Sequence, residues 1–351
     1  MSLGPTRRLT RIPRPGRRAR YLAVKAAYGG GAFGGVAGAT FAVLVTEAKL
    51  ARRVIGTPTE QAPLAAGSYG RGRRGDTPLH LAVLGDSAAA GLGCASADQT
   101  PGALIAGAIA RDLRRRVALE VVAVTGAQSA DLDVQVGRAL RRRLDVAVLI
   151  IGANDVTHRV PVAKAAHDLA RAVRTLRAAG VLVVVGTCPD LGTVKPVPQP
   201  LRTIAAHWSR RLAAAQTVAT VEQDGIAVSL GDLLVQDFSE QPHLWSADRF
   251  HPSADGYRRI VDAMLPSVLT SLGVTIPVSV PISDSVQDVD LAARVASQEP
   301  GVEVDPVAES GGRLARLRRR LPLVGRGAPE GPTDPSELSA DLAEAAVPPP
   351  H

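Results

Sequence analysis

The sequence predicts a three-layer α/β/α sandwich with a mainly five-stranded parallel sheet. Five short apolar runs recur between residues 77 and 273, and each gap between them is long enough for a helix. Continuous apolar runs of this length are typical of strands buried on both faces, as in a parallel sheet covered by crossover helices. The runs are residues 79–85, 119–124, 146–152, 181–186 and 226–230.

The segments between the runs carry the end signals of helices. Residues 101–116 begin at Pro101, which suits a first helical turn, and close on three arginines, which suit a helix C-terminus. Residues 162–180 end at Gly180, a good residue to terminate a helix. Active sites of parallel sheets form at the carboxyl ends of the strands, so the residues that follow each run are the candidates for chemistry.

Three residues at such positions suit nucleophilic catalysis by a hydroxyl. Ser87 follows the first run in Gly85-Asp86-Ser87, and Asp248 and His251 lie three residues apart before the last expected helix. A serine becomes a good nucleophile when a histidine takes its proton, and that histidine needs a carboxylate to fix its tautomer. We therefore expect Ser87 as nucleophile, His251 as base and Asp248 as its orienting acid. The structural alternatives are helix caps for Ser87 and Asp248 and a surface position for His251.

Gly126 and Asn154 follow the second and third runs. An oxyanion that develops on an attacked carbonyl needs preorganised N–H donors, and the backbone N–H groups of Ser87 and Gly126 with the Asn154 amide would supply three. Asn154 is the only asparagine in the chain, which favours a specific role over a simple turn position. We expect Asp86 to cap a helix and Asp155 to brace its loop.

Four short blocks of the sequence resemble, in order, those of the SGNH (GDSL-type) hydrolases. The blocks are Gly85-Asp86-Ser87, Gly126, Gly152-x-Asn154-Asp155 and Asp248-x-x-His251-Pro252. The resemblance covers residues 79–273 and implies the flavodoxin-like SGNH hydrolase fold. It also implies a catalytic triad of Ser87, His251 and Asp248 and an oxyanion hole of Ser87, Gly126 and Asn154. Members of that family are esterases, lipases, lysophospholipases, thioesterases and carbohydrate deacetylases; the first block here lacks the Leu of the strict GDSL form.

The predicted function is serine-dependent ester hydrolysis through an acyl-enzyme, of the carboxylesterase, lipase or lysophospholipase type. Three alternatives stay open: acyl transfer to another acceptor, carbohydrate deacetylation at the same site, and a non-catalytic module that binds the cell envelope. The partner expected is a small-molecule or lipid acyl ester. The long loop 186–202 is expected to line its acyl or alcohol pocket, with Trp245 either as a wall of that pocket or as part of the core.

No cofactor or metal is expected. The sequence contains no phosphate-binding loop, no dinucleotide-binding glycine motif after a strand and no HExxH motif. Its two cysteines, Cys94 and Cys188, cannot form a zinc site by themselves. They either pair in a disulfide or are two small buried residues.

The excess positive charge belongs to a basic tail formed by residues 1–25. The net charge is +8, and eight Lys or Arg residues lie between Arg7 and Lys25, before Glu47, the first acidic residue. Without those eight, 33 basic residues face 33 acidic ones. This concentration of charge predicts a tail rather than a nucleic-acid-binding surface, so no nucleic-acid partner is expected.

Residues 26–46 are uncharged and long enough to cross a bilayer. The positive charges before them predict a membrane anchor with the catalytic domain on the extracytoplasmic side, and the near absence of asparagine resembles the codon bias of a GC-rich bacterium. The alternatives are a cleaved export signal and a secreted protein, or a soluble segment and a cytoplasmic one. Gly30, Gly34 and Gly38 have the spacing of helices in close contact, which is compatible with self-association.

Two further stretches are expected to lie outside the catalytic domain, which spans residues 77–273. Residues 47–76 are interpreted as a linker, and residues 274–351 as a largely disordered C-terminal extension. Within that extension, residues 313–327 either place Leu314, Leu317 and Leu321 on one helical face or form a disordered basic tract.

Overall fold

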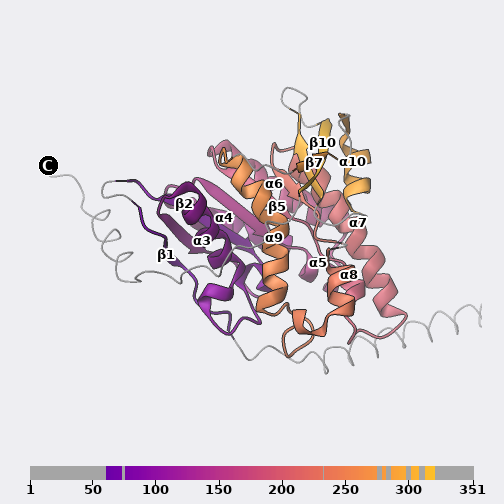
Figure 1. The fold of residues 1–351 in the computed structure, drawn as a ribbon. Helices are drawn as coiled ribbons and strands as arrows, with labels where there is room; N and C mark the ends of the chain where they lie inside the picture. The colour runs from indigo at the N-terminus through magenta and orange to yellow at the C-terminus, as the bar shows by residue number, and fades with distance from the viewer. Residues whose placement is uncertain are drawn as a thin grey trace, which may run out of the picture. The chain divides into compact units, whose positions relative to one another are not determined.

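Five parallel strands form the centre of one mixed sheet (Figure 1). The structure is a computed structural model that describes residues 61–72, 76–231, 233–274, 279–281, 286–297, 302–307 and 313–320. In space the central strands follow the order β3 (Val117–Val121), β2 (Leu79–Gly85), β4 (Val146–Ile150), β5 (Leu182–Gly186) and β6 (Ile226–Val228). This is the doubly wound, flavodoxin-like order, and it confirms the predicted fold class.

Helices cover both faces of the sheet (Figure 1). Successive strand residues point to opposite faces, so Leu81 and Val83 pack under one helix pair and Ala82 and Leu84 under another. The first pair is α3 (Pro101–Leu113) and α9 (Ala254–Ser271), and the second is α4 (Leu132–Ala139) and α6 (Val162–Ala178). The long helix α7 (Leu201–Val221) lies beside α6. The core is therefore divided in two by the sheet, as expected for three layers.

The sheet continues beyond residue 273, where the predicted catalytic domain ends. Strand β9 (Val302–Pro306) pairs antiparallel with β6, and β10 (Leu314–Arg320) pairs antiparallel with β9. Helix α10 (Val289–Ala296) packs over these strands against α7. The remaining elements here are β7 (Ser279–Pro281) and β8 (Gln287–Asp288). The prediction of a largely disordered extension is therefore wrong for these residues.

The added strands escaped prediction because their buried face is narrow. In β10, Ala315 and Leu317 are buried while Arg316 between them is exposed, so the segment alternates as a strand and is not helical. In β9 the buried valines flank Glu303, which is itself fully buried. Neither strand presents the continuous apolar run that marks the central five.

The sheet also includes part of the predicted linker. Strand β1 (Gly67–Tyr69) pairs antiparallel with β3, and the buried Tyr69 hydroxyl donates to Ala65 O at 2.7 Å. Residues 1–60 lie outside the described residues, and with them the predicted tail, the segment 26–46 and its glycines. Among the helices that the structure does describe, none combines the length and apolar character needed to span a bilayer.

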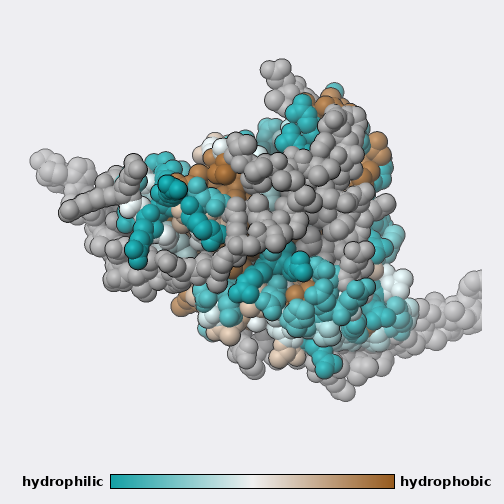
Figure 2. Space-filling model, viewed as in Figure 1, coloured by the Kyte–Doolittle hydropathy of each residue, from teal (hydrophilic) through white to brown (hydrophobic). Residues whose placement is uncertain are grey.

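The surface of the described residues is mainly polar on the face that Figure 2 shows. Apolar residues appear there as separate small patches between hydrophilic ones. Most large apolar side chains of the described residues lie in the core clusters, and isolated ones such as Leu64 and Val134 are exposed.

Candidate active site

Ser87 lies at the carboxyl edge of the sheet because a tight turn follows β2. Gly85 ends the strand with φ of 134°, and a Cβ at that position would lie 1.9 Å from Ile150 O, so only glycine fits. Asp86 then caps the short helix α2 (Ser87–Ala90), accepting the Ala88 N–H at 2.9 Å. The turn leaves Ser87 between the ends of β3 and β4, the switch point where α/β sheets bind ligands.

Ser87, His251 and Asp248 form one line of hydrogen bonds. Ser87 Oγ lies 3.0 Å from His251 Nε2, and His251 Nδ1 lies 2.6 Å from Asp248 Oδ2. The tautomer with its proton on Nδ1 satisfies both contacts, since Nδ1 then donates to the carboxylate and Nε2 accepts from the hydroxyl. The first contact joins residues 164 positions apart, and His251 is only 5% exposed. The structure therefore brings the predicted nucleophile, base and orienting acid together.

The Asp248 carboxylate is held by its own loop. Its Oδ1 accepts hydrogen bonds from Ser246 Oγ at 2.7 Å and from the Phe250 and His251 N–H groups at 2.9 Å. Burial alone would raise the pKa of Asp248, but the bonds from His251, Ser246 and Phe250 together outweigh it and hold the pKa well below its usual range. Asp248 is thus a carboxylate at neutral pH and stabilises a positive charge on His251.

The two remaining predicted residues lie on the loops that flank Ser87. Gly126 is exposed, with φ of 85°, in a turn where Ala127 N–H donates to Val124 O at 3.0 Å. Asn154 lies in the first turn of helix α5 (Ala153–Thr157), directly after β4. In the described part of the chain neither residue is hydrogen-bonded to Ser87, His251 or Asp248, so the structure places them on the loops after the two strands that neighbour β2.

Two buried glutamines that were not predicted from the sequence hold the strand ends at this edge. Gln135 of α4 accepts the Gly85 N–H at 2.7 Å and donates to Gly85 O at 2.9 Å. Gln216 of α7 accepts the Cys188 N–H at 2.7 Å and donates to Ile151 O at 3.0 Å. Each amide therefore continues the backbone hydrogen bonding where the strands diverge. The signal was present, because a glutamine on the apolar face of a helix needs a buried partner.

A cavity of about 50 Å³ opens beside Ser87 and His251. Loop 186–202 supplies Leu191 and Val194 to its wall, as predicted, and Trp245 lines it while also packing edge-on against Phe238. Further apolar lining residues are Ile150, Ala153, Pro189, Leu230, Phe250 and Ile260. The cavity therefore offers an apolar space next to Ser87.

Buried polar groups around the cavity are satisfied structurally. Burial raises the pKa of Asp86 to about 7, against the lowering effect of its bond from Ala88 N–H. Asp190 forms an ion pair with Arg210 at 2.8 Å and accepts the Gly192 N–H, which holds the cavity loop.

Of the two alternatives for the cysteines, the disulfide is not formed, since Cys94 and Cys188 are separate buried thiols.

Comparison with known proteins places this site in a family. The sequence model of the GDSL-like lipase/acylhydrolase family matches residues 83–259. A GDSL-like esterase of Mycobacterium tuberculosis is 38% identical over 301 residues, which cover 82% of this chain and 91% of that protein.

Two solved structures of esterases also resemble the chain. A psychrotrophic esterase of Pseudoalteromonas sp. aligns with a TM-score of 0.45 and 17% identity, over 56% of this chain and 99% of that one. An acetylxylan esterase of Geobacillus stearothermophilus aligns with a TM-score of 0.43 and 16% identity, over 56% of this chain and 95% of that one.

Proposed function

Since this chain belongs to the GDSL-like lipase/acylhydrolase family and is a serine ester hydrolase, we propose that Ser87 is the nucleophile of its reaction. One observation carries the assignment: the hydrogen-bonded line from Ser87 Oγ through His251 to Asp248. The line has the geometry that general-base activation of a hydroxyl needs, with both contacts within 2.6–3.2 Å.

The reaction runs in two displacements. His251 Nε2 takes the Ser87 proton as Oγ attacks the acyl carbonyl, and the negative charge on the carbonyl oxygen is held by the Ser87 and Gly126 N–H groups and the Asn154 amide. The bond to the alcohol oxygen then breaks, and His251 returns its proton to the departing alcohol. In the second displacement His251 deprotonates water, which attacks the acyl-enzyme and releases the acid as Ser87 regains its proton.

Replacement of the nucleophile tests this assignment. Ser87→Ala should lower turnover of p-nitrophenyl acetate by several orders of magnitude and abolish labelling by a fluorophosphonate probe, because the attacking oxygen is gone. Ser267→Ala is the matched control: Ser267 is a fully buried serine of α9 that does not line the cavity, so its substitution should leave turnover unchanged. Undiminished turnover by Ser87→Ala would remove the assignment.

The cavity supports a short acyl group as the substrate's acid part. The cavity is small, about 50 Å³. Its apolar walls suit alkyl carbons, and Ser87 and His251 at its edge would present the carbonyl. We infer that acetyl to butyryl esters fit, and acetylated sugars would place their acyl group in the same space.

A series of p-nitrophenyl esters from two to twelve carbons tests the acyl length. kcat/KM should be greatest at two to four carbons and fall at least ten-fold by eight, because a longer chain must displace the walls of the cavity to enter, and carbons left in water add no binding energy. Leu191→Ala removes part of the wall and should move the optimum to longer chains. The control Leu291→Ala, at a half-exposed position of α10, should leave the order unchanged. An optimum at eight carbons or more would contradict the short-acyl proposal.

For location, we propose that residues 26–46 anchor the chain in a membrane with the hydrolase domain on the extracytoplasmic side. The sequence supports this through the uncharged length of the segment and the eight positive charges before it. Full-length protein should stay in the membrane pellet after alkaline carbonate extraction, and Val36→Arg should release it. Full-length protein found in the soluble fraction would count against the anchor. Gly30, Gly34 and Gly38 would be the contact stripe of any paired anchors.

A further inference from the structure

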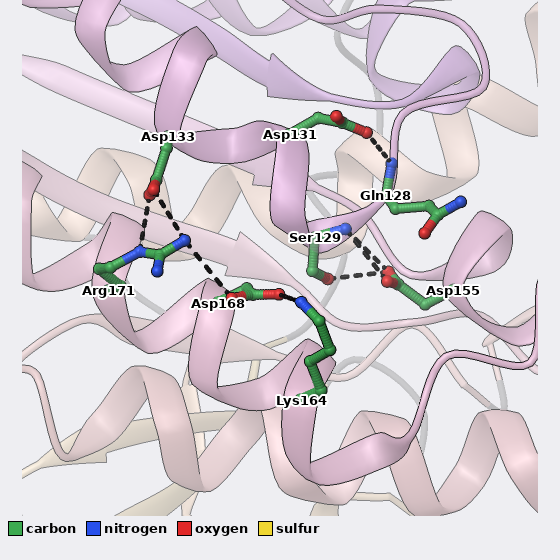
Figure 3. A network of polar contacts seen from close by, with 8 residues as sticks. All are labelled: Gln128, Ser129, Asp131, Asp133, Asp155, Lys164, Asp168 and Arg171. Carbon is green, nitrogen blue, oxygen red and sulfur yellow. Dashed lines mark hydrogen bonds and ion pairs between the residues drawn. The ribbon is translucent and has the colours of Figure 1, made fainter.

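The loops after β3 and β4 are joined by one buried contact, between Ser129 and Asp155 (Figure 3). The Ser129 N–H donates to the carboxylate, 3.1 Å from Oδ1 and 3.2 Å from Oδ2, and the Ser129 hydroxyl donates to Oδ2 at 2.8 Å. Each residue is 1% exposed. Both donors of one serine thus meet one carboxylate across 26 residues of sequence.

This contact is close in sequence to two proposed donors of the oxyanion hole, the Gly126 N–H and the Asn154 amide. Asp155 directly follows Asn154, and Ser129 comes three residues after Gly126. A Cβ built at Gly126 would meet no atom within 4 Å, so the turn is open on that side. Asn154 lies in helix α5, which is only five residues long and contacts α7. The Ser129–Asp155 contact is therefore a buried side-chain link between the two loops that carry the proposed donors.

We propose that Asp155 is a positioning residue for ester hydrolysis, which through Ser129 fixes the Gly126 N–H relative to the Asn154 amide. The inference rests on the proposed function, because it assigns the contact a role in that oxyanion hole. Donors must lie about 2.7–3.1 Å from the oxyanion to stabilise it. A displacement of about 1 Å can cost about a hundred-fold in rate, so a tie between the loops has a direct effect on turnover.

The neighbouring carboxylate Asp168 provides the contrast within the same network (Figure 3). Asp168 is 4% exposed and pairs with Lys164 at 2.7 Å and Arg171 at 3.4 Å, both on its own helix α6. It therefore stabilises a helix and its packing without joining the two loops. Asp155→Asn and Asp168→Asn make the same chemical change at two buried carboxylates. Only Asp155 accepts hydrogen bonds from Ser129 on the other loop.

The experiment measures kcat and KM for p-nitrophenyl acetate in full-length variants, per active site counted by exhaustive fluorophosphonate labelling. Asp155→Ala should lower kcat about a hundred-fold with KM within two-fold, since it removes every contact to Ser129. Asp155→Asn and Ser129→Ala each keep one contact and should lower kcat about ten-fold. Asp168→Asn should lower the melting temperature and leave kcat per site unchanged. The midpoint of the pH–rate profile should not move in any of them, because His251 and Asp248 are untouched.

Each outcome supports or overturns the positioning role. A purely structural role would reduce the number of labelled sites and leave kcat per site within two-fold, and that result overturns the proposal. If Asp155→Ala fails to fold, Asp155→Asn and Ser129→Ala provide the same test. Persistent activity in Ser87→Ala would defeat the proposed function itself, whereas an inactive Ser87→Ala beside a fully active Asp155→Asn and Ser129→Ala would defeat the positioning role alone.

Discussion

The two sides of Ser87 are built in different ways. On one side, Asp248 is held by hydrogen bonds that all arise within residues 246–251, and it holds His251 in turn. On the other side, Gly126 and Asn154 lie on separate loops whose tie is the Ser129–Asp155 contact. The side of the proposed base is therefore a local structure, and the side of the proposed oxyanion donors depends on packing between distant segments.

This difference predicts that the two sides respond differently to substitutions elsewhere in the protein. A loop whose hydrogen bonds close on themselves keeps its geometry when residues elsewhere change. Donors on two loops keep theirs only while the helices and strand ends that carry them stay in register, through groups such as Gln135. Substitutions far from the reacting atoms should thus affect stabilisation of the oxyanion before they affect proton transfer.

The largest effect is expected from Asp248→Asn, which tests the base side. Its Oδ1 can still accept from Ser246, Phe250 and His251, so the loop is kept. The amide NH₂ now faces His251 Nδ1, which favours the tautomer with the proton on Nε2, where it cannot accept from Ser87. We expect kcat to fall about 10⁴-fold. A loss below ten-fold per active site, or an equal loss in the exposed control Asp255→Asn, would contradict this role.

Asn154→Ala tests the oxyanion side directly. Only the Asn154 backbone carbonyl has hydrogen bonds in the described contacts, to Thr157 and His158, and alanine retains it. Loss of one oxyanion donor should lower kcat about 10²–10³-fold, or about 2.7–4 kcal/mol, with little change in KM. A raised KM at unchanged kcat would instead make Asn154 a group that binds the substrate's ground state.

A double-mutant cycle of Asn154→Ala and Asp155→Ala sharpens the comparison. If Asp155 acts by placing the Asn154 amide relative to Gly126, its loss should cost much less once that amide is absent. We expect Asp155→Ala to lower kcat by less than ten-fold in the Asn154→Ala background, measured per active site. The same Asp155→Ala change in the Asp248→Asn background should keep its full factor. Equal factors in the two backgrounds would refute the coupling.

The sequence predicted the central sheet and the triad because both leave strong local signals. The five central strands are continuous apolar runs, and Ser87 and the Asp248–His251 pair stand where strands or loops end beside a helix. Their meeting could be expected because the carboxyl ends of parallel strands share one edge of a sheet.

Other parts of the structure depend on partners distant in sequence, and their weaker signals did not identify those partners. Ser129 is one serine among many until the fold sets it against Asp155, and Gln135 becomes a clamp only when α4 packs behind Gly85. The bracing role expected for Asp155 did not name its partner for this reason. Strand β10 was missed because its many arginines obscure the alternation of buried and exposed residues that marks a strand. Its pairing with β9 becomes clear only in the structure.

The smallest effect concerns two carboxylates of the site, Asp86 beside Ser87 and Asp248 beside His251, whose contributions to stability should respond to pH with opposite signs. Burial raises the pKa of Asp86 to about 7, so between about pH 4 and 7 the unfolded chain ionises and the folded one does not. Wild type should therefore lose stability over that range relative to Asp86→Asn, which keeps an acceptor for Ala88 N–H. At about 1.4 kcal/mol per unit of raised pKa, the change is at most a few kcal/mol.

Asp248 supplies the opposite case, because its lowered pKa stabilises the fold above about pH 4 and loses that contribution only as pH falls further. Urea unfolding of wild type and the two Asn variants from pH 4 to 8 measures both. The gap between wild type and Asp86→Asn should change steadily up to about pH 7 and then level, whereas ionisation of the Asp248 carboxyl itself adds no slope above about pH 5. If the stability curves of wild type and Asp86→Asn ran parallel from pH 4 to 8, the Asp86 carboxyl would have an ordinary pKa in the folded protein. Hydrogen bonds to that carboxylate would then offset the cost of its burial, as they do at Asp248.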